Sequence, residues 1–217
     1  MFHKFRLNGD CLFSFPTKPR KTPEKPWDIA VSPNDNTIYI SDWSRRRVYV
    51  YNGQNGKKIR SIKGCYRRGK KDEFVEFSRP AGITFDLGGR LMIADRGERC
   101  VWCINTEGDE LIKTIGDGHI QDPYGIAVAK DGKIVVSESE SDCVSVFGDD
   151  GELLHYFGGT GTGEGQLCRP HHVFIDSNMK IYVADTQNKR VQIFSLPEGL
   201  YQNLMPAPTA DITLEHP

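Results

Sequence analysis

The residues best suited to chemistry in this sequence are a run of cations with aromatic side chains among them. Residues 18–71 contain 15 Lys and Arg against 4 Asp and Glu, although the 217-residue chain has a formal net charge of −1. Cations neutralise phosphates and exposed rings stack on unpaired bases, so this composition suits single-stranded RNA. An acidic segment of a protein partner would be attracted by the same charges. A solvated surface without a partner would also account for them.

The six cysteines do not have the spacing of a metal site. Cys100 and Cys103 form a single C-x-x-C within a segment that we interpret as a strand, where an odd separation points the two thiols to opposite faces. The second C-x-x-C of a cysteine-rich zinc module is missing. We therefore expect reduced cysteines, no cofactor and a cytoplasmic location.

Several other classes of protein have no support in the sequence. No apolar run approaches the roughly 20 residues that span a bilayer, and the amino-terminal MFHKFRLNGDCLFSF has no sustained apolar core of a secretory signal. The Gly-rich GGTGTGEGQL at 158–167 lacks the Gly-Lys-Ser/Thr of a phosphate-binding loop. No G-x-S-x-G indicates a serine hydrolase.

Four internal repeats set the architecture that must position the cations. The repeats start at Pro26, Pro80, Pro123 and Pro170, at spacings of 54, 43 and 47 residues. Each contains short alternating runs separated by turn signals such as Asp131-Gly132, which predict a series of four antiparallel strands. Four strands at this period describe a propeller blade, and separate small sandwiches are disfavoured because one such unit cannot bury its own faces.

We therefore predict an all-β fold, a β-propeller of four-stranded blades with an amino-terminal half-blade. The half-blade covers 1–15, because its residues match the last two strands of a blade. The blades fall within 16–203, at about 26–62, 80–115, 123–157 and 170–203, and a flexible polar tail covers 204–217. The open arc has edges that must be protected or must pair, which makes self-association a possibility to test.

One carboxylate recurs at the same place in each repeat. The four residues are Asp42, Asp95, Glu138 and Asp185. A ring of metal ligands is one interpretation, and a cap on the tight turn into the next strand is the other. Because the carboxylate occurs once per blade, we favour the structural role.

The repeats resemble the NHL-repeat family of β-propellers. The fourth reads RPHHVFID followed by IYVADTQNKRVQIF, and weaker copies are ITFDLGGRLMIADRGERCVWCI and IYISDWSRRRVYVY. The resemblance covers about residues 26–196 and implies a six-bladed ring, relative to which this chain is incomplete. It is nearest to the NHL domain of tripartite-motif proteins, which recognises RNA or protein cargo. This chain lacks the RING and B-box clusters, so ubiquitin ligation is not implied, although a substrate-recognition role is.

Strand order predicts which face carries the charge. If the strands of a blade are called a to d from the centre outwards, the b–c loops and the d–a connections lie on one face. We predict that twelve cations gather on this rim, with Trp43, Tyr66 and Trp27 among them. The predicted partner-binding residues are Arg45, Arg46, Arg47, Trp43, Tyr66, Arg67, Arg68, Lys70, Lys71, Arg20 and Lys21.

An enzyme is the alternative function. The resemblance to peptidyl-amidating lyase, an NHL-type enzyme, would imply three zinc-binding histidines from different blades. His171 stands where such a ligand would project, but the equivalent residues are Trp27, Ala81 and Tyr124. A catalytic zinc needs three protein ligands, so we predict no catalytic or metal residues. The prediction is a non-catalytic module that binds a protein or single-stranded RNA, with a metal-dependent lyase-like or lactonase-like propeller as the alternative.

Overall fold

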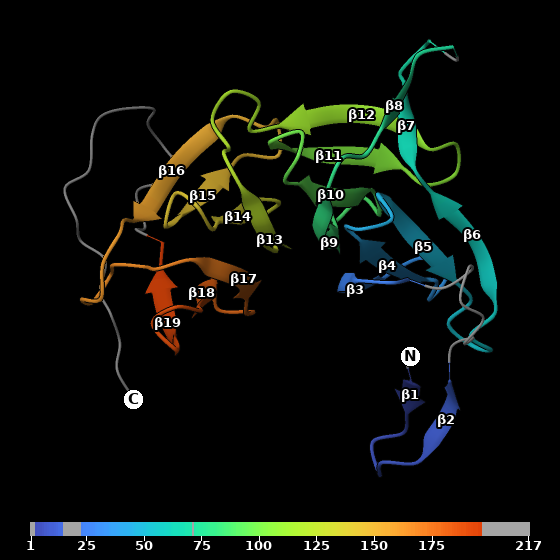
Figure 1. Cartoon of the computed structure of the whole chain (residues 1–217), viewed down its shortest axis with the longest axis horizontal. Helices are drawn as coiled ribbons and strands as arrows, with labels where there is room; N and C mark the ends of the chain where they lie inside the picture. The colour runs from blue at the N-terminus through green and yellow to red at the C-terminus, as the bar shows by residue number, and fades with distance from the viewer. Residues whose placement is uncertain (1–2, 15–22, 71, 197–217) are drawn as a thin grey trace.

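A computed structural model describes residues 3–14, 23–70 and 72–196, and every regular element in them is a β-strand (Figure 1). Four sheets follow one another around an arc, and a separate hairpin lies near the amino terminus. This arrangement confirms the predicted all-β propeller with four blades. Because the described residues contain no helix, none of them forms a helix able to cross a membrane.

The strands of each blade pair antiparallel in chain order, as the repeats predict. The first blade consists of β3 (Pro26–Val31), β4 (Ile38–Asp42), β5 (Arg47–Tyr51) and β6 (Lys58–Ile62). The second consists of β9 (Pro80–Phe85), β10 (Leu91–Asp95), β11 (Cys100–Asn105) and β12 (Glu110–Ile115). The third consists of β13 (Pro123–Val128), β14 (Ile134–Glu138), β15 (Cys143–Phe147) and β16 (Leu153–Gly158).

The two ends of the arc are less regular. In its described part the fourth blade has β17 (Pro170–Ile175), β18 (Lys180–Asp185) and β19 (Arg190–Ser195). The predicted half-blade contains the hairpin β1 (His3–Phe5) and β2 (Cys11–Ser14), and the Lys4 Nζ donates to the Gly53 carbonyl oxygen at 2.6 Å. The predicted tail at 204–217 and the last predicted part of the fourth blade lie outside the described residues.

Most of the hydrophobic core lies between neighbouring blades, and a smaller cluster lies on β4 and β5 of the first blade. Three clusters of buried residues join the first blade to the second, the second to the third and the third to the fourth. The strands β10 and β14 are therefore buried on both faces. Cys100 belongs to the first cluster and Cys103 to the second, so the two thiols point to opposite faces of β11.

The inner strands of neighbouring blades approach closely at two glycines. A Cβ atom on Gly82 would lie 2.6 Å from the Tyr124 carbonyl oxygen, and one on Gly125 would lie 2.6 Å from the His171 carbonyl oxygen. Only a residue without a side chain fits there. These glycines stand two residues after the leading proline of their repeats. They therefore determine how closely β9, β13 and β17 pack around the centre of the arc.

The recurring carboxylate joins three segments of its blade. The Asp95 carboxylate accepts hydrogen bonds from the backbone N–H groups of Ser78 and Arg79 at 2.8 and 2.7 Å, which lie in the connection that enters the blade. It also accepts from the Gly97 N–H at 3.0 Å and the Trp102 Nε1–H at 3.3 Å. The bond from Gly97 is the predicted cap on the turn. The bonds from Ser78 and Arg79 also tie the carboxylate to the connection that precedes β9.

The other three carboxylates repeat this arrangement. Asp42 accepts from the N–H groups of Lys25 and Ser44, Glu138 from that of Gln121, and Asp185 from that of Cys168. Burial by itself raises the pKa of Asp185, but hydrogen bonds from the Asn188 side chain, the Cys168 backbone N–H and the Arg190 side chain together lower it below its ordinary value. Each buried carboxylate is therefore satisfied by its own blade.

We expect Asp95→Ala to destabilise the fold by about 2–4 kcal/mol, because several donors lose their acceptor at a buried site. Urea unfolding followed by circular dichroism measures this change. The control is Glu98→Ala, which removes an exposed carboxylate from the same loop. Equal stability of the two variants would contradict the structural role of Asp95.

Candidate binding surface

The loop between β4 and β5 holds the first group of predicted site residues at the surface. The Asp42 carboxylate accepts hydrogen bonds from the N–H groups of Ser44 and Arg45, each at 3.0 Å. Arg46 has a φ of 51°, which reverses the chain before β5 begins. This tight turn exposes Arg45 and Arg46 and leaves Trp43 half-buried beneath them.

A lysine from the segment before β3 covers the aromatic side chain of this loop. The Lys25 Nζ lies 5.0 Å from the centre of the Trp43 ring, a cation–π distance. The Arg47 Nε donates to the Arg45 carbonyl oxygen at 3.0 Å. Glu24 partly neutralises Arg45, with 2.7 Å between its Oε2 and the Arg45 Nε. We call these residues (Lys25, Trp43, Arg45, Arg46 and Arg47) the first-blade patch.

The second group of predicted residues lies on a hairpin that the sequence did not predict. The connection after β6 forms β7 (Gly64–Arg67) and β8 (Phe74–Glu76). The strand β7 pairs parallel with β12, the outer strand of the second blade, and the Tyr66 N–H donates to the Asp109 carbonyl oxygen at 2.8 Å. Tyr66 packs on Phe74 with 4.9 Å between ring centres, and both side chains are 41% exposed.

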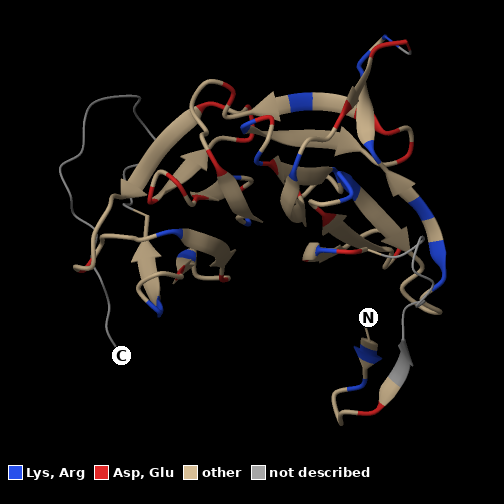
Figure 2. Cartoon of the chain, in the orientation of Figure 1, with Lys and Arg blue, Asp and Glu red and all other residues tan. Residues whose placement is uncertain are grey.

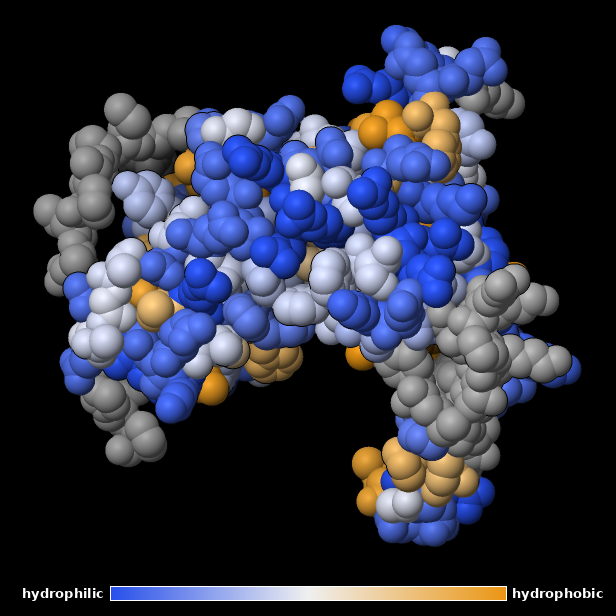
Figure 3. Space-filling model, viewed as in Figure 1, coloured by the Kyte–Doolittle hydropathy of each residue, from blue (hydrophilic) through white to orange (hydrophobic). Residues whose placement is uncertain are grey.

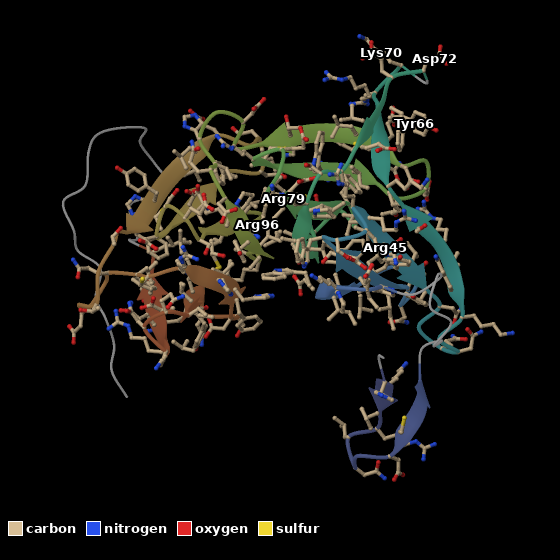
Figure 4. All side chains as sticks on the ribbon, in the orientation of Figure 1. Arg45, Tyr66, Lys70, Asp72, Arg79 and Arg96 are labelled. Carbon is tan, nitrogen blue, oxygen red and sulfur yellow. The ribbon has the colours of Figure 1, made fainter. Side chains whose placement is uncertain are left out.

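The hairpin projects outwards and is separate from the first-blade patch. Figure 4 places Lys70 at its tip and Arg45 over the body of the first blade, and Figure 2 shows cations at both places. Figure 3 shows hydrophobic surface at the base of the hairpin. The predicted gathering of these cations on one rim therefore needs correction for the hairpin, because pairing with β12 carries this connection to the outer edge of the arc.

The charge of the hairpin is also partly neutralised. Glu73 lies 2.8 Å from the Lys70 Nζ and 3.5 Å from the Arg67 Nε, and the Lys70 hydrogen bond lowers the pKa of Glu73. Arg68 is exposed beside them. Three predicted site residues lie outside the described residues, namely Arg20, Lys21 and Lys71.

A cluster at the inner ends of the blades was not predicted as a site. The rings of Trp27, Tyr124 and His171 come from β3, β13 and β17. The Tyr124 and His171 rings stack with 4.5 Å between centres, and the Trp27 ring meets Tyr124 edge-on at 5.0 Å. The repeats place these residues at equivalent positions, but only the curvature of the arc brings the rings together.

A guanidinium covers the other side of this cluster. The Arg96 guanidinium lies 3.8 Å from the centre of the Tyr124 ring, and its Nε lies 2.7 Å from an oxygen of Asp122. Burial, together with the cations Arg96 and Arg169, lowers the pKa of His171. The cluster thus combines stacked rings with a cation that Asp122 holds in place.

The described residues contain no group of three His, Cys, Asp or Glu side chains placed to hold a metal ion. None of the six cysteines, all of which are described, forms a disulfide. Burial raises the pKa of Cys65 and Cys143 to about 12 and that of Cys103 to about 11. These three thiols are therefore poor nucleophiles at neutral pH.

Comparison with known proteins supports the class that the fold defines. A family profile described as a 6-bladed beta-propeller matches residues 111–209. The chain is 35% identical over 89 residues to the E3 ubiquitin-protein ligase TRIM71 of Rattus norvegicus, a match that covers 41% of this chain and 9% of that protein. The chain is thus a β-propeller, and its partial matches to TRIM71, lin-41 and brain tumor support the resemblance to NHL-repeat proteins that its repeats predicted.

Lyases are also among the similar proteins. A probable peptidyl-alpha-hydroxyglycine alpha-amidating lyase of Caenorhabditis elegans is 31% identical over 145 residues, which is 59% of this chain and 41% of that protein. A solved streptogramin B lyase superposes with a TM-score of 0.58 at 13% identity, covering 82% of this chain and 57% of the other. The chain therefore spans less than half of the two curated relatives, and the structural likeness shows the fold alone.

We expect Arg96→Gln to raise the pKa of His171, because removal of a nearby cation makes protonation of the imidazole easier. Titration of the histidine ring signals by NMR measures this shift. Arg99→Gln, in the same loop but exposed, provides the control. An unchanged His171 pKa in Arg96→Gln would mean that the guanidinium does not act on this ring.

Proposed function

We propose that this chain is a non-catalytic binding module and that the first-blade patch is its contact surface. The observation that carries the proposal is that three consecutive arginines and the half-buried Trp43 stand on one turn that Asp42 holds in place, with Lys25 over the Trp43 ring. The NHL-like relationship supports a role in recognition. The reduced cysteines are consistent with the cytoplasm as the place where it acts.

Single-stranded RNA is the partner that we would test first. The patch combines exposed cations, which neutralise phosphates, with an indole that can stack on an unpaired base once Lys25 moves aside. An acidic segment of a protein would use the same cations but would not need the stacking. The separate hairpin carries Tyr66 and Arg68 and would serve as a second contact for a longer partner.

We expect Arg46→Glu to weaken binding of a labelled single-stranded RNA pool, because the variant reverses one charge in the patch. We expect Trp43→Leu to cost about 1–3 kcal/mol of binding free energy if the indole stacks on a base. Fluorescence anisotropy at several salt concentrations measures both effects. The control is Lys57→Glu, an exposed charge reversal in the turn between β5 and β6, which the strand order places on the opposite face.

Binding that weakens steeply with salt, is reduced in Arg46→Glu and is retained in Lys57→Glu would support the patch as an RNA site. Absence of binding at low salt would exclude RNA. The patch would then be assigned to a protein partner, and capture with acidic peptides would follow.

A metal-dependent lyase or lactonase is the second candidate, because a lyase is among the similar proteins and His171 lies at the inner ends of the blades. Elemental analysis of the purified protein distinguishes the two functions. We expect substoichiometric zinc, since Trp27 and Tyr124 stand where further ligands would be required. One zinc per chain that disappears in His171→Ala would favour the enzyme and contradict our proposal.

A further inference from the structure

The first and fourth blades differ from the other two at one position of the inner strand. Where the second and third blades have Gly82 and Gly125, the first blade has Asp28 and the fourth has His172. The glycines allow neighbouring inner strands to pack backbone against backbone. Asp28 and His172 have side chains instead, and each lies on a blade at an end of the described arc.

These two side chains meet. The His172 Nε2 lies 3.4 Å from the Asp28 Oδ1, and the His172 Nδ1 lies 3.0 Å from the Val173 carbonyl oxygen, to which it can donate. The Nε2–Oδ1 separation is an ion-pair distance, so the nearby Asp28 carboxylate favours the protonated imidazole. The strands β3 and β17 face each other across the open side of the arc in Figure 1.

Asp28 is held in place for this contact. Its Oδ1 accepts a hydrogen bond from the Ile29 N–H at 2.8 Å, and its Oδ2 accepts from the Ile83 N–H at 2.9 Å. The side chain of Asp28 is 11% exposed, whereas that of His172 is 51% exposed. The carboxylate is therefore fixed to β3 and β9, and the histidine is the partner that solvent protons can reach.

The pair borders an apolar pocket at the centre of the arc, where the inner strands of all four blades meet. The pocket has a volume of about 540 Å³ and is lined by β3, β9, β13 and β17. Ile29 and Phe174 contribute to it and are 52% and 61% exposed. In the third blade, the equivalents of these residues are Ile126, which is buried, and Ala127, which packs against the cluster shared with the fourth blade. Ile29 and Phe174 are therefore exposed at positions that, in the third blade, pack against a neighbouring blade.

We propose that Asp28 and His172 form a pH-sensitive latch, which joins the first and fourth blades when His172 is protonated and releases them when His172 is neutral. Release lets β17 separate from β3 and widens the apolar pocket that the inner strands line. The latch does not depend on the proposed binding function.

Among the charged groups near His172, Asp28 is the one that acts on its protonation. The charged or titratable residues among those lining the pocket are Asp28, Asp86 and His172, and Asp86 is paired with Arg90. From β13, Gly125 brings only backbone against His172. Its neighbour in sequence, His171, belongs to the ring cluster, where Arg96, Arg169 and Asp122 act on it.

The direction of the pH effect follows from the ion pair. The hydrogen bond with Asp28 raises the pKa of His172 above its ordinary 6.5, although burial opposes the rise. A group whose pKa is raised by folding stabilises the fold fully below its unfolded pKa, and this stabilisation is lost as the pH rises through the raised value. The latch is therefore closed in mildly acidic solution and opens as the pH rises.

The test is to measure the melting temperature and the radius of gyration of the full chain between about pH 5 and about pH 9, the range in which histidine titrates. Small-angle X-ray scattering gives the radius. For the wild type we expect a decrease in melting temperature and an increase in radius across the His172 titration. His172→Gln should remove both the decrease in melting temperature and the increase in radius. His171→Gln, a matched change one residue away, should retain both changes.

Asp28→Asn provides a second variant, because it removes the charge of the carboxylate while the amide oxygen can still accept from one of the two backbone N–H groups. NMR titration should then show the pKa of His172 moving back towards 6.5. Changes in melting temperature and radius that persist in His172→Gln, or an unchanged His172 pKa in Asp28→Asn, would overturn the latch.

Discussion

The buried carboxylate at the end of the second strand is the constraint on which each blade depends. A carboxylate removed from water must be surrounded by donors, and in this chain those donors are backbone N–H groups of the incoming connection and of the loop that follows. Satisfying Asp95 therefore fixes where the blade begins and how its second and third strands are joined. The same requirement acts at Asp42, Glu138 and Asp185, so the four blades share one geometry.

This shared geometry leaves the exposed side chains of each loop free to differ. The loop after Asp42 carries Arg45 and Arg46, and the corresponding loop of the second blade turns Arg96 towards the ring cluster instead. A rigid scaffold with variable loops is a common basis for recognition. The concentration of cations on the first blade is thus a property of its loop residues rather than of the fold.

The repeats were sufficient to predict the strands, the blades and the structural role of the four carboxylates, because these features depend on local periodicity and recur. They could not predict the hairpin β7–β8, since its pairing with β12 joins Tyr66 to Glu110 across a long separation in sequence. They also could not predict that Asp28 meets His172, because the curvature of the whole arc brings these residues together. The sequence shows which residues carry the positive charge, but the division of the described cations into two places required the structure.

The claim that the first-blade patch is the contact surface is tested most directly by mapping where a bound single-stranded RNA touches the chain. Photo-crosslinking followed by mass spectrometry of the crosslinked peptides would identify the contact residues. Our account predicts crosslinks in the peptide that contains Trp43 and Arg45, with weaker ones on the hairpin at Tyr66. Crosslinks confined to the turns at the opposite ends of the strands, around Lys57 and Lys130, would contradict it.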